Sequence, residues 1–209
     1  MDKEVISVSF VAVFSKILPN VPALENKFCR DLFGMPYDTF NGVTQEGYVI
    51  AVENKPMPSI TITPQKIVFK AKTVDELAKY VNAIAREFAS KSIPMAYSAF
   101  GVNSEYQWIN LPETAGRWIW QHFINPTLGN GESNQCNSIS LRFGINESEH
   151  LNMEFLPRIG RHDGVFASIN HHHSIGGNEL PNHEVLAKLF KDTTVLIDEQ
   201  FRNIIGIEQ

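Results

Sequence analysis

The chain has little of what marks several large classes of protein. No apolar run approaches the roughly 20 residues that a membrane-spanning helix needs, so no membrane association is expected. Only two cysteines are present, Cys29 and Cys136, and they lie far apart, which does not indicate a disulfide framework. Asp2 and Glu4 precede the first apolar stretch, where a signal peptide would carry basic residues. We therefore expect a cytoplasmic protein in a reducing compartment.

Positive charge is also scarce. Lysine and arginine number 18 against 23 aspartates and glutamates, which gives a formal net charge of −5, and no basic stripe is apparent. Nucleic-acid binding draws much of its affinity from neutralising phosphates. Nucleic acid is therefore not expected as a partner. The composition, 43% hydrophobic and 20% charged, is instead that of an ordinary globular protein of 209 residues.

The first part of the chain alternates between strand-like and helix-like patterns. Val5 to Phe14 has the two-residue period of a strand, and helical spacing follows from Leu24 until Gly34 stops it. Three strand-like runs come next, in the order GYVIAVE, SITIT and KIVFKA. Thr73 then opens the capping box TVDE of an amphipathic helix that ends near Lys91.

The same order of elements follows in the second part. A strand is predicted in PMAYSAFGV, a helix in PETAGRWIWQHFI, and three strands in NSISLRFGI, HLNMEFLP and GVFASINHH. A closing helix is predicted from about Asn182 to Ile205. We therefore predict an α+β fold made of two tandem βαβββα halves, residues 1–92 and 93–209, which form one compact unit. Its sheet would be largely antiparallel, with the helices on one face.

One resemblance accompanies this pattern. The run GYVIAVENKPMPSITITPQKIVFKAKT, the amphipathic helix after it and the C-terminal LIDEQFRNIIG resemble a sporadically distributed family of uncharacterised bacterial proteins of similar size. The resemblance is in the order of elements and the hydrophobic pattern over most of the chain. It implies the duplicated strand-helix-three-strand-helix arrangement and no particular activity.

Histidines gather in the stretch SINHHHSIGGNELPNH, which holds four of the seven in the chain. His171 and His173 continue the covered side of the strand that contains Val165, and two histidines at this spacing can share a transition metal. His183, near the start of the last helix, can supply a third ligand, and oxygen can come from Glu179 or Glu184. The alternative, which we favour, is that the cluster is the polar end of a strand with hydrogen-bonded histidines.

Small polar residues recur on the opposite side of the predicted strands. The face includes Ser140 and Arg142, then Glu154, then Asn170 and His172, each opposite the apolar residues of its strand. A curved sheet would turn this face into a groove around one guanidinium, one carboxylate and one imidazole. The alternative is an antiparallel face that simply contacts water.

No reaction is indicated by any motif. The sequence has no nucleophile next to a base, no phosphate-binding loop and no complete metal signature, so we assign no catalytic residue. We predict a non-catalytic protein that binds a protein segment or a small polar ligand through Arg142, Glu154, His172, Ser140 and Asn170. The alternative function is a metal-assisted enzyme that uses the region from His171 to His183. Sheet edges and exposed aromatics favour a homodimer.

Overall fold

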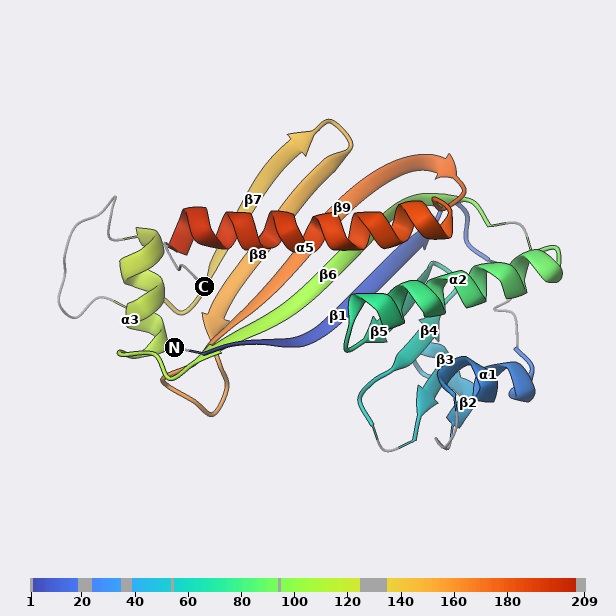
Figure 1. Ribbon diagram of the computed structural model, residues 1–209, viewed down its shortest axis with the longest axis horizontal. Helices are drawn as coiled ribbons and strands as arrows, with labels where there is room; N and C mark the ends of the chain where they lie inside the picture. Colours follow the sequence, from blue (N-terminus) through green and yellow to red (C-terminus); the bar gives the residue numbers. More distant parts are fainter. Residues whose placement is uncertain are drawn as a thin grey trace. The chain divides into compact units, whose positions relative to one another are not determined.

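The computed structural model describes residues 2–18, 24–34, 39–53, 55–93, 95–124 and 135–205. The elements follow in the order β1 (Asp2–Phe14), α1 (Asn26–Phe33), β2 (Thr39–Thr44), β3 (Gly47–Val52), β4 (Ser59–Ile62), β5 (Lys66–Ala71), α2 (Val74–Ser90), β6 (Tyr97–Ile109), α3 (Ala115–Ile119), the π-helical turn η1 (Trp120–Ile124), β7 (Ile139–Asn146), β8 (Glu149–Pro157), β9 (Val165–Asn178) and α5 (His183–Ile205). Figure 1 shows their course along the chain. None of the helices in these ranges combines the length and the apolar character that crossing a membrane requires.

The nine described strands form a single antiparallel sheet. Their order across it is β2-β3-β4-β5-β1-β6-β9-β8-β7, so β2 and β7 are the edge strands. This confirms the predicted α+β class. The helices expected from the sequence are present, and the second part of the chain has the expected order of elements.

Strand β2 was not expected from the sequence. Its residues, TFNGVT, show no alternation of apolar and polar side chains, and its two large apolar residues, Phe40 and Val43, are exposed. The glycine within it, Gly42, lies under the ring of Phe40, where an added Cβ would come within 3.3 Å of the ring. The first part of the chain thus has one strand more than the second. Duplication of the two halves, with a division near residue 92, stays a prediction.

The chain forms two compact units, neither of which is one continuous segment. The Phe10 unit contains residues 7–102 and 172–190, and the Trp108 unit contains residues 1–6, 103–171 and 191–209. Each unit has its own hydrophobic core. The Phe10 core receives Leu186 and Phe190 from α5, whereas the Trp108 core receives Ile197 and Phe201 from the same helix.

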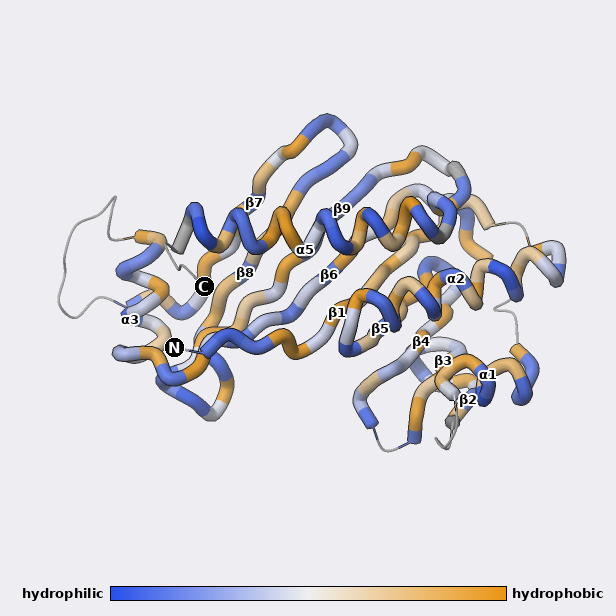
Figure 2. The backbone as a smooth tube through the Cα atoms, viewed as in Figure 1, coloured by the Kyte–Doolittle hydropathy of each residue, from blue (hydrophilic) through white to orange (hydrophobic). Residues whose placement is uncertain are grey.

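In the Phe10 unit, an aromatic cluster forms the centre of the core. Phe10 is fully buried, and its ring centre lies 5.4 Å from that of Phe190 and 5.5 Å from that of Phe100. Helix α2 covers this core with an apolar stripe, and Figure 2 shows apolar and polar residues alternating along it. The predicted capping box is confirmed, because Thr73 accepts from the Glu76 amide and Glu76 accepts from the Thr73 amide.

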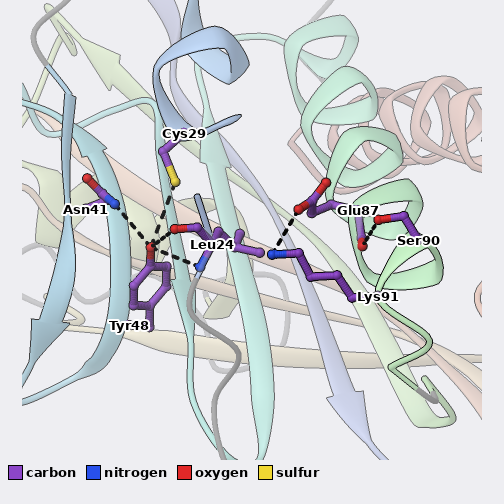
Figure 3. Close-up of polar contacts among 7 residues, drawn as sticks. All are labelled: Leu24, Cys29, Asn41, Tyr48, Glu87, Ser90 and Lys91. Atoms are coloured by element: carbon purple, nitrogen blue, oxygen red, sulfur yellow. Dashed lines mark hydrogen bonds and ion pairs between the residues drawn. The ribbon is translucent and has the colours of Figure 1, made fainter. Parts of the chain in front are cut away.

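Beside α1, the hydroxyl of Tyr48 forms a small buried network (Figure 3). It donates to the carbonyl of Leu24 at 3.2 Å and accepts from the side-chain amide of Asn41 at 3.3 Å. The thiol sulfur of Cys29 lies 3.9 Å from the same oxygen. Cys29 is therefore a core residue of α1.

In the Trp108 unit, Trp108 is almost fully buried among other aromatic rings. Its ring centre lies 4.9 Å from Phe201 in an edge-to-face arrangement and 6.4 Å from Trp118 of α3. Lys3 of β1 forms an ion pair of 2.6 Å with Asp198 of α5, and its ammonium also lies 5.1 Å from the centre of the Phe201 ring. These contacts fix α5 against the strands of this unit.

Candidate functional site

The polar face of the Trp108 unit has a pocket on strands β7, β8 and β9. Strands β7 and β8 are antiparallel, with Ser140 opposite Glu154 and Arg142 opposite Asn152. Because side chains alternate along strands, these four lie on one side of the sheet. Together with Asn170 of β9 they line a pocket of about 320 Å³. The structure thus brings together Ser140, Arg142, Glu154 and Asn170, all of which were predicted as binding residues.

The charged groups of this pocket are available to a ligand. Arg142 and Glu154 are both exposed, and within the described part of the chain neither takes part in an ion pair or a side-chain hydrogen bond. The two residues are diagonal neighbours across the β7–β8 pair, since Arg142 is opposite Asn152 and Glu154 is opposite Ser140. A positive and a negative group therefore face the same small volume without neutralising each other.

The amides of the pocket, in contrast, are held in place. The side-chain nitrogen of Asn170 donates to the side-chain oxygen of Asn103, and its oxygen accepts from Asn152 at 3.4 Å. Since these contacts fix both ends of the Asn170 amide, the hydrogen-bonded side chains of Asn152, Asn170 and Asn103 form an ordered polar surface.

His172 belongs to the predicted binding set, but the residues that line the pocket do not include it. Its Nε2 lies 3.3 Å from the hydroxyl of Ser174, two residues further along β9. The structure thus assigns His172 a local contact on its own strand.

A second cluster surrounds His171, which is 3% exposed. Its Nε2 lies 2.6 Å from Oε1 of Glu149 at the start of β8, and its Nδ1 lies 2.8 Å from the hydroxyl of Thr193 on α5. The other carboxylate oxygen of Glu149 accepts from the side-chain amide of Asn146 at 2.7 Å. Both partners of the imidazole are therefore oriented, and Glu149 is held from two sides.

His173 follows His171 by two residues on β9, so strand geometry puts both on one side. Its ring stacks on that of Phe100 with the ring centres 4.7 Å apart. The imidazole nitrogen of His171 and the carboxylate oxygen of Glu149, which lie 2.6 Å apart within the Trp108 unit, are donors of the kinds that zinc and related transition metals take.

Glu149 was missed in the sequence because we looked for an oxygen ligand close to the histidines in the chain. Glu179 and Glu184 were the candidates, yet the carboxylate comes from a different strand, twenty-two residues before His171. Its signal in the sequence is the turn NES before it, which connects β7 to β8 and makes Glu149 the first residue of β8. His183 is the first residue of α5, and its side chain lies outside the described residues.

Comparison with known proteins adds no assignment, because neither a family model nor a curated protein matches this sequence.

Proposed function

We propose that this protein binds an extended peptide segment of a partner protein at the pocket around Arg142 and Glu154. The observation that supports the proposal is that Arg142 and Glu154 carry opposite charges, do not pair with each other and lie beside ordered side-chain amides. A peptide with side chains of both signs would satisfy both groups, and a charge-assisted hydrogen bond to Arg142 is among the stronger contacts that a protein can offer.

The position of β7 supports a peptide over a smaller polar ligand. Among the described strands, β7 is the last of the sheet and pairs with β8 alone, so its outer edge offers backbone donors and acceptors to a further strand. A peptide that adds to this edge would gain backbone hydrogen bonds while its side chains reach the pocket beside it. A free zwitterion such as an amino acid would use only the two charges.

Synthetic ten-residue peptides of acidic, basic and mixed charge test the proposal. Mixed-charge peptides should bind best, and Arg142→Ala should weaken their binding about tenfold or more, the worth of one charge-assisted contact. Arg30→Ala, which removes an equally exposed arginine from α1, is the matched control and should bind like wild type. Equal binding by all three proteins would remove the Arg142 site from consideration.

Proline substitutions in the best peptide separate the two kinds of ligand. Alternate prolines remove backbone donors and should abolish edge pairing. If a proline-containing peptide, or a free amino acid, binds as well as the parent peptide, the pocket recognises charge alone and edge pairing is wrong.

The contact between Glu149 and His171 supports a second candidate function, a metal-assisted enzyme in which His173, two residues after His171 on β9, supplies a third ligand. With its Nδ1–H donated to Thr193, His171 would present Nε2 to a metal in place of the proton now shared with Glu149. Three protein ligands would leave a fourth position for water or substrate, as catalytic zinc sites do. The metal would act there as a Lewis acid.

Titration with Zn²⁺ and Co²⁺ tests this second candidate function. One equivalent of metal should bind, and both Glu149→Gln and His173→Phe should weaken binding at least about tenfold, with the phenyl ring keeping the stacking on Phe100. His162→Ala, at an exposed position outside the cluster, is the control. Metal binding that survives both cluster variants, or no binding at all, would exclude this candidate.

A further inference from the structure

The Phe10 unit contains a larger pocket that the peptide site does not use. It has a volume of about 580 Å³ and lies between helix α2 and the segment that leads from β9 into α5. A volume of this size is within the range of small-molecule sites.

Small residues on α2 make room for the pocket. Ala85 and Ala89 are four residues apart on one side of the helix, and both are exposed although they are apolar. Their short side chains leave the space that longer residues would fill. Beneath them, Val81 and Leu186 are buried members of the core, so the deepest part of the pocket is apolar.

The end of α2 forms one wall. Ser92 has a left-handed backbone with φ of 53°, and its amide donates to the carbonyl of Ala89 while the amide of Ile93 donates to that of Phe88. This is the hydrogen-bond pattern of a Schellman turn, which reverses the chain tightly at the end of a helix. The reversal brings Ile93 and Met95 to the pocket as further apolar wall.

Tyr97 adds a buried polar group to this apolar lining. The residue is 4% exposed and lines the pocket, yet its hydroxyl has no hydrogen-bond partner among the described residues. A ligand that enters the pocket can form a hydrogen bond with this hydroxyl. Burial also raises the pKa of Tyr97, which keeps the phenol neutral, so its oxygen can accept from an ammonium group and its O–H can donate to a neutral head group.

The charges of the residues that line the pocket indicate which charge a ligand would carry. Glu179 is the one charged residue among those that line the pocket, and no lysine or arginine is among them. Asn182 uses its side-chain oxygen to cap α5, accepting from the amide of Val185 at 3.0 Å, and keeps its amide hydrogens for another partner. The lining therefore favours a cation or a neutral group over an anion.

We propose that this pocket binds a small amphiphilic molecule with an apolar body and a cationic or neutral head group that reaches Glu179 and the hydroxyl of Tyr97. The apolar body occupies the space over Ala85 and Ala89. An anionic amphiphile of the same length meets the carboxylate of Glu179 without a compensating cation, and binds more weakly.

The neutral dye N-phenyl-1-naphthylamine, whose fluorescence rises in apolar surroundings, tests the pocket in the full-length protein. Wild-type protein should enhance the fluorescence in a saturable manner with one site per chain. Ala89→Trp fills the pocket and should weaken dye binding about tenfold or more, whereas Arg86→Trp adds the same bulk at a neighbouring exposed position of α2 that does not line it. Circular dichroism checks that both variants fold, and Ala85→Trp is the second pocket-filling variant.

Competition identifies the head group. Decylamine should displace the dye at concentrations roughly tenfold lower than decanoate, which has the same chain length and the opposite charge. The preference should shrink in Glu179→Gln, and Tyr97→Phe should weaken dye or amine binding about threefold to tenfold. If Ala89→Trp and Arg86→Trp bind the dye alike, or if decanoate competes as well as decylamine, the proposal is wrong.

Discussion

The imidazole Nδ1 of His171 and the hydroxyl of Thr193 lie 2.8 Å apart inside the Trp108 unit, which joins strand β9 to helix α5. Thr193 is 1% exposed, so water cannot replace either partner.

Replacing Thr193 by valine should therefore lower the free energy of unfolding by about 1–3 kcal/mol, because the change keeps the shape and removes the buried hydroxyl that contacts the imidazole nitrogen. Urea denaturation measures the loss. In a His171→Leu background the same change should cost much less, since the nitrogen is gone. An equal cost in both backgrounds would show that the contact contributes nothing.

Ser92 should be improved by glycine. A left-handed φ of 53° strains any residue with a Cβ, and glycine is the common choice at this position of a Schellman turn. Ser92→Gly is expected to raise stability by about 0.5–1 kcal/mol. Thermal unfolding should show a higher midpoint, whereas Ser90→Gly, two residues earlier in the last turn of α2, should lower it. A lower midpoint for Ser92→Gly would contradict the strain argument.

Stability should fall in alkali because of Tyr106. Burial raises the pKa of Tyr106 to about 12, and Asp198 adds to the increase, although a hydrogen bond with Ser104 opposes it. In the unfolded chain a tyrosine has a pKa near 10. The folded state holds the Tyr106 proton more tightly than the unfolded chain does. The contribution of Tyr106 to the free energy of unfolding is therefore fully present below about pH 10 and is lost as the pH rises through about 12.

Absorbance at the tyrosinate band, followed with circular dichroism, checks this expectation. Near pH 11, where a tyrosine with the ordinary pKa is about 90% ionised, part of the signal of the five tyrosines should stay un-ionised while the protein is folded. Tyr106→Phe should remove part of that late titration. Nearly complete ionisation of all tyrosines near pH 11 in a folded protein would refute the burial argument.

The two cysteines should differ in reactivity. Cys29 is fully buried next to Tyr48 (Figure 3), and burial raises the pKa of its thiol, so little reactive thiolate forms. Cys136 is partly exposed. With a thiol-reactive disulfide reagent, one thiol per native chain should react readily and the second only on unfolding. Cys136→Ser should leave no fast-reacting thiol, and a fast reaction in that variant would contradict the placement of Cys29.

The sequence predicted the elements whose patterns are enforced by burial. The alternation from Val5 to Phe14 and the stripe of α2 correspond to core residues in the structure, and the capping box at Thr73 is local and therefore readable. Strand β2 was missed because its two large apolar residues, Phe40 and Val43, do not alternate with polar ones and are both exposed.

The sites divide in the same way. Arg142 and Glu154 could be grouped from the sequence. The side-chain alternation of each strand puts both on the polar face, and the pairing of β7 with β8 brings them together. Glu149 beside His171 depends on contacts between separate elements, and no spacing in the chain encodes it. The pocket over Ala85 could not be predicted either, because it depends on how two elements pack and not on the sequence pattern of either one.

Helix α5 has a consequence for the time course of folding during synthesis. Leu186 and Phe190 complete the core of one unit, and Ile197 and Phe201 complete the core of the other. A nascent chain that ends before residue 183 therefore leaves apolar surface open in both units. Exposed apolar surface of this kind promotes aggregation, and neither core is complete before translation has passed this helix.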